Sequence, residues 1–132
     1  MDAGEEVVVG GSGTRTTLDL GDGDGELRRA RAWVRGQLEG LTADQAEDVV
    51  LVADELVSNA LRHGSAPRRL LLVRDDGFLR FEVEDGSPAA ARPTEGTIRG
   101  GRGLTLVGAL SSSWGQRSTG RGKVVWAEFV LG

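Results

Sequence analysis

The feature that most constrains the fold is a long amphipathic helix predicted between Thr42 and Gly64. Thr42 and Gln45 fit a capping box, in which the Thr hydroxyl and the Gln side chain satisfy free backbone N–H groups at the helix start. His63 and Gly64 mark its end, since glycine can adopt the left-handed conformation that often follows a helix. Between them an apolar stripe recurs at helical spacing and must be buried against other elements. The stripe consists of Ala46, Val49, Val50, Ala53, Leu56, Val57, Ala60 and Leu61.

The segments on either side of this helix predict a sheet. Asp75-Asp76-Gly77 is a hairpin signal between two apolar segments. Helical periodicity also occurs at residues 26–38 and 103–110. Strands are predicted at residues 14–20 (an edge strand), 69–74, 78–84, 112–118 and 123–131. The expected fold is of the α+β class, a two-layer α/β sandwich whose mixed, mostly antiparallel sheet is covered on one face by helices.

Length and composition narrow the organisation and the class of protein. The chain has 132 residues, which suits one domain at 14–132 after a flexible, glycine-rich tail at 1–13. The net charge is −4 and opposite charges are interspersed, which argues against a nucleic-acid partner. No apolar run reaches the ~20 residues of a membrane helix, and the acidic N-terminus is unlike a signal peptide. We therefore expect a cytoplasmic protein without membrane association.

Glu55 and Asn59 are the first candidate site residues. They are four positions apart on the long helix, so they lie on one face at the edge of the apolar stripe. An Asn carbonyl oxygen suits Mg²⁺, and a carboxylate one turn away can orient or deprotonate an attacking hydroxyl. The alternative is an ordinary solvent-exposed helix face, and the spacing alone does not decide between the two.

Asp85, followed by Gly86, is the second candidate. Alternation in the preceding strand places Asp85 on the apolar face, with Leu79, Phe81 and Val83. A buried carboxylate needs a partner, and a ligand's exocyclic amine would provide one. The alternative is an Asp that caps the turn before Gly86.

The glycine-rich segment from Arg99 to Leu104 is the third candidate. It leads directly into a helix, where backbone N–H groups and the helix dipole favour an anion. Arg99 and Arg102 can pair with phosphate oxygens. The spacing of Gly101 and Gly103 is neither a Rossmann fingerprint nor a P-loop. The alternative is a flexible connector, which the irregular stretch from Ser87 to Gly101 would extend.

The order of these segments resembles the GHKL ATPases, the superfamily of gyrase, heat-shock chaperone, histidine kinase and mismatch-repair ATPases. Residues 54–64 (DELVSNALRHG) resemble its N-box, and residues 85–88 its G1 box. Residues 101–107 resemble its G2 box, and residues 113–126 its last two strands. The resemblance is strongest to the single-domain bacterial anti-sigma-factor serine/threonine kinases.

The resemblance implies ATP and Mg²⁺ as cofactors and a role for each candidate residue. Asn59 would hold Mg²⁺ on the phosphates, and Glu55 would be the general base. Asp85, in the loop with Gly86, would contact the adenine amine. Arg99 would contact the terminal phosphate. The G2 segment would hold the nucleotide, with backbone groups of Gly101 and Gly103 on the phosphates, beside Arg102 and Leu104.

Two departures from the family pattern predict weaker nucleotide affinity. The G1 pattern Asp-x-Gly-x-Gly is replaced by Asp85-Gly-Ser-Pro-Ala89, so its two later glycines are missing. Val124 stands where many members have a threonine near the adenine.

Three functions remain open. The first is an anti-sigma factor with serine/threonine kinase activity on an anti-sigma factor antagonist, with a sigma factor as partner and a possible homodimer. The second is a nucleotide-dependent protein-binding switch with little or no kinase activity. The third is an interaction domain without nucleotide, which requires protein groups alone to satisfy Asp85.

Overall fold

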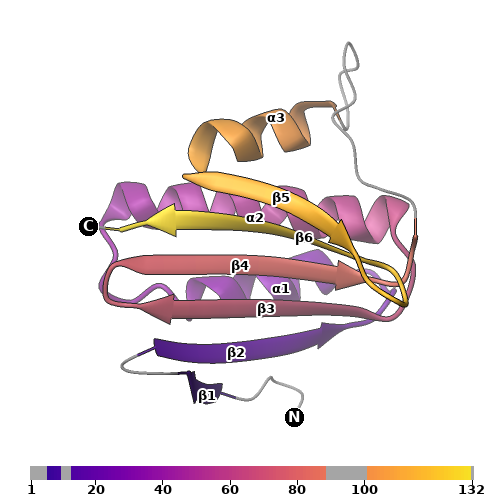
Figure 1. Cartoon of the computed structure of the whole chain (residues 1–132), viewed down its shortest axis with the longest axis horizontal. Coiled ribbons are helices and arrows are strands. Elements are labelled where there is room, and N and C mark those ends of the chain that lie inside the picture. Colours follow the sequence, from indigo (N-terminus) through magenta and orange to yellow (C-terminus); the bar gives the residue numbers. More distant parts are fainter. Residues whose placement is uncertain (1–5, 10–12, 89–100, 132) are drawn as a thin grey trace.

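The computed structural model describes residues 6–9, 13–88 and 101–131, and of residues 6–9 and 101–103 it describes the backbone alone. Six strands form one sheet in the order β1-β2-β3-β4-β6-β5, and all neighbours pair antiparallel (Figure 1). The strands are β1 (Glu6–Val9), β2 (Gly13–Leu20), β3 (Arg68–Asp75), β4 (Phe78–Asp85), β5 (Ser113–Ser118) and β6 (Lys123–Val130). The helices are α1 (Glu26–Arg35), α2 (Ala43–His63) and α3 (Gly101–Leu110).

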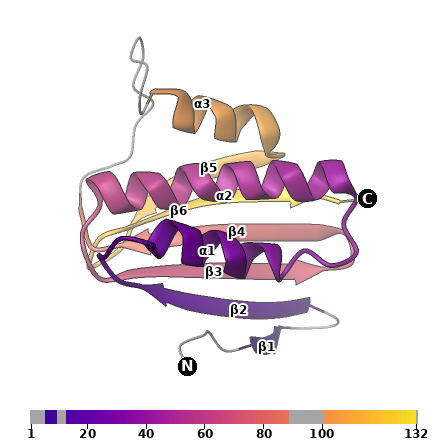
Figure 2. The same ribbon diagram turned by 180° about the vertical axis from the view of Figure 1, so that it is seen from behind.

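The helices and the sheet form two layers. Helices α1 and α2 lie across one face of the sheet, and α3 packs on α2 beside β5 (Figure 2). The predicted α+β sandwich with helices on one face is therefore confirmed. In the described part of the chain no parallel strand pair occurs, so the sheet is antiparallel and not mixed. No helix in those residues combines the length and apolar character that crossing a bilayer requires.

Side chains at the start of α2 fix both its first turn and its position on the sheet. The predicted capping box is present: Gln45 N donates to Thr42 Oγ1 at 3.1 Å, and Thr42 N donates to Gln45 Oε1 at 2.9 Å. Gln45 Nε2 also donates to the carbonyl oxygen of Leu131 at 2.7 Å, just after β6 ends. One residue thus caps the helix and joins it to the sheet.

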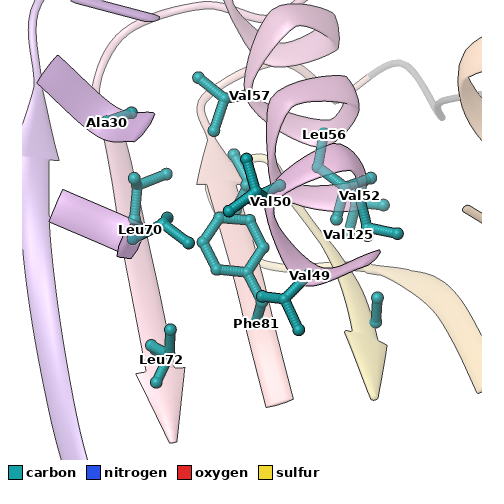
Figure 3. Packing of buried hydrophobic residues seen from close by; sticks show 14 of the residues in the cluster. Ala30, Val49, Val50, Val52, Leu56, Val57, Leu70, Leu72, Phe81 and Val125 are labelled. Atoms are coloured by element: carbon teal, nitrogen blue, oxygen red, sulfur yellow. The ribbon is translucent and has the colours of Figure 1, made fainter. Parts of the chain in front are cut away.

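The core lies between α2 and the central strands. Phe81 of β4 has no exposed surface and lies beneath Val49 and Val50 of α2 (Figure 3). Leu70 of β3 and Val125 of β6 extend the same layer on either side. The alternation of β4 places every second residue in this layer, and the last of them is Asp85.

The N-terminal part of the sheet differs from the expectation. Residues 14–20 were expected to form an edge strand, but β1 pairs with the outer side of β2, so that expectation is wrong. The short run Val7–Val9 had been included in the predicted tail at 1–13. Four residues are too few for a periodicity to be recognised, and only pairing with β2 defines this strand.

The two faces of β4 give a matched test of this packing. Phe81→Ala removes a fully buried ring and should lower the free energy of unfolding by about 3–5 kcal/mol. Phe78→Ala removes the same ring from a half-buried position and should cost clearly less. Urea unfolding followed by tryptophan fluorescence measures both, and equal losses would contradict the assigned register of β4.

Candidate functional site

Three predicted segments end or begin on the same side of the molecule (Figures 1 and 2). Strand β4 ends at Asp85, α2 ends at His63, and α3 begins at Gly101. Figures 1 and 2 both place the carboxyl end of α2, the carboxyl end of β4 and the amino end of α3 on the same side. The backbone joins two of them directly, because Gly86 N donates to the carbonyl oxygen of Ser65 at 2.7 Å.

Glu55 and Asn59 lie on α2 near this end, and both side chains are half-buried. They follow the edge of the apolar stripe beside Val52 and Leu56, as the helical spacing predicted. Within the described residues, neither side chain makes a hydrogen bond or an ion pair. A half-buried carboxylate and amide without protein partners on one face are available to a ligand.

The residue before Glu55 has a structural role instead. Asp54 Oδ1 and Oδ2 both accept hydrogen bonds from Arg31 Nε at 3.1 Å, and Arg31 Nη2 lies 3.0 Å from Oδ2. The hydrogen bond that Arg31 donates to Asp54, together with the negative charge of Asp54, raises the pKa of Arg31. This pair holds α1 against α2 on the side of α2 that Glu55 does not occupy.

Asp85 is almost completely enclosed, with 3% of its surface exposed. Its Oδ1 accepts from Ser87 N at 2.7 Å and from Lys123 Nζ at 3.2 Å, and its Oδ2 lies 3.0 Å from Lys123 Nζ. The burial agrees with the predicted position on the apolar face, and the bond from Ser87 is the turn-capping interaction of the alternative. The partner that the carboxylate required is therefore a lysine of the same chain.

Gly64 closes the remaining side of the Asp85 carboxylate. A Cβ atom on Gly64 would lie 2.6 Å from both Cγ and Oδ2 of Asp85. Gly64 is extended, with φ −91° and ψ −175°, so the predicted left-handed conformation is wrong. Glycine is needed at this position for close approach to Asp85 and to the carbonyl oxygen of Ala60, and not for its backbone angles.

Arg68 binds carbonyl groups at the carboxyl end of α2. Its Nε donates to the carbonyl oxygen of Ala60 at 2.9 Å and its Nη2 to that of Gly64 at 3.2 Å, while Nη1 pairs with Asp22. A guanidinium group at these carbonyls compensates the negative end of the helix dipole. Arg68 was not predicted, although Arg68, Leu70 and Leu72 share one strand face in the sequence.

Lys123 is the other residue that sequence reasoning missed. It is directly opposite Asp85 in the register of β4 and β6, and only 5% of its surface is exposed. A signal was present, because Lys123 falls on the same strand face as Val125 and Ala127 and is the only lysine in the chain. A charged residue on an apolar face predicts a buried partner.

The phosphate-binding candidates are described only in part. Helix α3 begins at Gly101, so Gly101 and Gly103 are in its first turn, as the G2 resemblance implies. Leu104 is buried in the core, so only its backbone would be available to a ligand. Arg99 lies outside the described residues, as does the side chain of Arg102.

Two cavities are lined by described residues. One, of about 430 Å³, adjoins Asp85 and Gly86 at the ends of β2, β3 and β4, with Arg68 and Arg121 in its wall. The other, of about 620 Å³, lies between the outer sides of α1 and α2. Glu55 and Asn59 line neither of them. In the described part of the chain, no three His, Asp or Glu side chains converge on a metal position.

Comparison with known proteins identifies the family. The family model described as "Histidine kinase-like ATPase domain" matches residues 24–129, which is most of the chain. The chain belongs to this family. Residues 24–129 of this histidine kinase-like ATPase domain include all the candidate site residues.

The fold of this histidine kinase-like ATPase domain is similar to that of a solved histidine kinase domain. It is the histidine kinase domain from Erythrobacter litoralis EL346 blue-light activated histidine kinase, with 23% sequence identity and a TM-score of 0.51. The similarity covers 80% of this chain and 59% of that one. At this identity it supports the fold and not the activity. No curated protein matches the chain.

The candidate residues suit the phosphate end of a nucleotide better than its base end. Among the described residues Asn59 and Glu55 have no protein partner, and both suit the phosphate and metal end. The Asp85 carboxylate offers no accessible position to a base, because Lys123, Ser87 N and Gly64 surround it. An adenine amine does not fit at Asp85 unless Lys123 moves.

The close approach at Gly64 leads to a direct test. Gly64→Ala should lower the free energy of unfolding by about 1–3 kcal/mol, because the added methyl group displaces the Asp85 carboxylate. Gly120→Ala is the matched control, since a Cβ there meets no atom within 4 Å. Chemical denaturation compares the two, and a Gly64→Ala protein as stable as the control would show that Asp85 does not occupy this position.

Proposed function

We propose that this domain binds Mg-ATP and works as an anti-sigma factor with serine/threonine kinase activity toward an anti-sigma factor antagonist protein. The observation that carries the proposal is the pair Glu55 and Asn59. Among the described residues their half-buried side chains have no protein partner, and they lie in the carboxyl-terminal half of α2, which packs against α3, in a family defined by ATPase domains.

Each residue has a role that follows from its chemistry. Asn59 would contribute one oxygen ligand to Mg²⁺. This ion usually binds few protein ligands and takes others from the phosphates. Mg²⁺ and ATP together would supply an electrophilic γ-phosphoryl group. Glu55 would accept the proton of a substrate hydroxyl group while the hydroxyl oxygen attacks the γ-phosphorus and ADP leaves. The first turn of α3 would direct backbone N–H groups at the phosphates.

A second candidate is a nucleotide-dependent switch with little or no phosphoryl transfer, which one observation favours. The Asp85–Lys123 pair satisfies the carboxylate with protein groups, as the third hypothesis also required. In a switch, weak base binding is sufficient if the nucleotide stabilises one partner-binding state. A sigma factor would be the partner in both cases, and a homodimer is compatible with both.

Replacement of Asn59, the proposed metal ligand, tests Mg²⁺-dependent ATP binding separately from folding. Asn59→Ala should lose the Mg²⁺-dependent part of ATP affinity, about tenfold for each ~1.4 kcal/mol of contact removed. Ser58→Ala, at the neighbouring half-buried position, is the control and should keep the wild-type affinity. Calorimetric titration with ATP, with and without Mg²⁺, measures both; unchanged Mg²⁺ dependence in Asn59→Ala would exclude the metal role.

Glu55→Gln tests the kinase against the switch. It should lower phosphoryl transfer by about 10²–10⁴-fold while ATP affinity is preserved, because the amide cannot accept the hydroxyl proton. Glu47→Gln, an exposed carboxylate two turns earlier on α2, should transfer at the wild-type rate. Transfer of labelled phosphate to the antagonist protein is the measurement. If Glu55→Gln retains full transfer, Glu55 is not the base; if no variant transfers, the switch is favoured.

A further inference from the structure

The buried ion pair at the end of β4 has a consequence for base recognition. Lys123 and Asp85 face each other across β4 and β6, and both side chains are more than nine-tenths buried. The ammonium group contacts both carboxylate oxygens, at 3.2 Å and 3.0 Å. An adenine amine is also a hydrogen-bond donor. The lysine and the adenine base would therefore compete for the same acceptor.

The other acceptor positions of Asp85 are also taken. A carboxylate has about four lone-pair positions. Oδ1 uses one for Ser87 N and one for Lys123 Nζ, and Oδ2 is in ion-pair contact with the same ammonium group at 3.0 Å. The last position on Oδ2 is on the side where Gly64 approaches. Lys123 is the one member of this shell that can leave, because its long side chain rotates while Ser87 N and Gly64 belong to the backbone.

We propose that Lys123 determines the base specificity of the nucleotide site by holding its ammonium group on the acceptor positions of Asp85 that an adenine amine would need. Adenine gains its hydrogen bond to Asp85 only when Lys123 swings away. With Lys123 in place, the site binds nucleotides through their phosphates and does not distinguish an amine from a carbonyl on the base. The inference rests on the proposed nucleotide site and adds its selectivity.

Two nucleotides that differ at the base amine test this specificity. Inosine triphosphate has the sugar and phosphates of ATP but carries a carbonyl oxygen in place of the amine and a hydrogen on the adjacent ring nitrogen. The wild-type protein should bind ATP no more tightly than inosine triphosphate. Lys123→Met removes the ammonium group at similar length, so it should favour ATP by about tenfold or more, as expected for one hydrogen bond to a charged group. Calorimetric titration in the presence of Mg²⁺ measures the ratio.

Two control variants distinguish the role of Asp85 as hydrogen-bond acceptor from the effect of removing any positive charge. Arg117→Met removes one positive charge from an exposed position on β5 and should keep the wild-type ratio. The double variant Asp85→Leu, Lys123→Met removes both charges of the pair and leaves no side-chain hydrogen-bond acceptor at position 85, so it should show no preference for ATP. A preference in the double variant equal to that of Lys123→Met would overturn the role of Asp85 as acceptor.

A measurement on the wild-type protein decides the question if Lys123→Met fails to fold. Lys123 is the only lysine in the chain, so ¹⁵N-labelled lysine gives a single Nζ signal. Because Lys123 stays on Asp85 in the wild type, saturating ATP and saturating inosine triphosphate should give the same Nζ signal. A shift or broadening with ATP that inosine triphosphate does not cause would show that adenine displaces Lys123 and would overturn the inference.

The outcomes distinguish the inference from the proposed function. If the wild type and Lys123→Met bind both nucleotides with the same ratio, Lys123 has no role in specificity and the nucleotide site stands. If neither protein binds either nucleotide, the proposed function and the inference both fall. Selective ATP binding by Lys123→Met supports both, even where the wild type binds weakly.

Discussion

Burial of the apolar stripe of α2 against the sheet is the interaction on which the rest of the structure depends. The capping box and the contact from Gln45 to Leu131 fix where the helix begins. Because the helix then crosses the sheet over Phe81, its carboxyl end arrives beside the last residue of β4. The same packing leaves one edge of the helix half-buried, with Glu55 and Asn59 on it, and α3 packs against this helix.

The end of the sheet carries a concentration of charge that this packing has to accommodate. Asp85 and Lys123 are buried together, and Arg68 compensates the carbonyl groups at the end of α2. Removing one partner of a buried ion pair typically costs about 3–5 kcal/mol, whereas the intact pair contributes little net stability. Such a pair stabilises the fold weakly but penalises any state in which only one partner is withdrawn. A ligand that takes the place of Lys123 on Asp85 avoids that penalty for the carboxylate.

Much of this architecture could be predicted from the sequence, because local signals and the fold agree. The capping box, the apolar stripe and the Asp75–Gly77 hairpin each specify their element without tertiary information. The placement of Asp85 on the buried face also followed from alternation. The short strand β1 could not be predicted, since only its pairing defines it. The need for glycine at position 64 depends on a side chain more than twenty positions away. The partner of Asp85 depends on the register of two strands that are not consecutive in the sequence.

Backbone amide chemical-shift mapping of a titration with Mg-ATP tests the central claim most directly, because it reports where the nucleotide lies without any substitution. The predicted result is that the largest shifts occur at the carboxyl end of α2, at the end of β4 and in the first turn of α3. Shifts confined to the cavity between α1 and α2, or no shifts in a folded protein at saturating nucleotide, would contradict a nucleotide site at this end of the sheet.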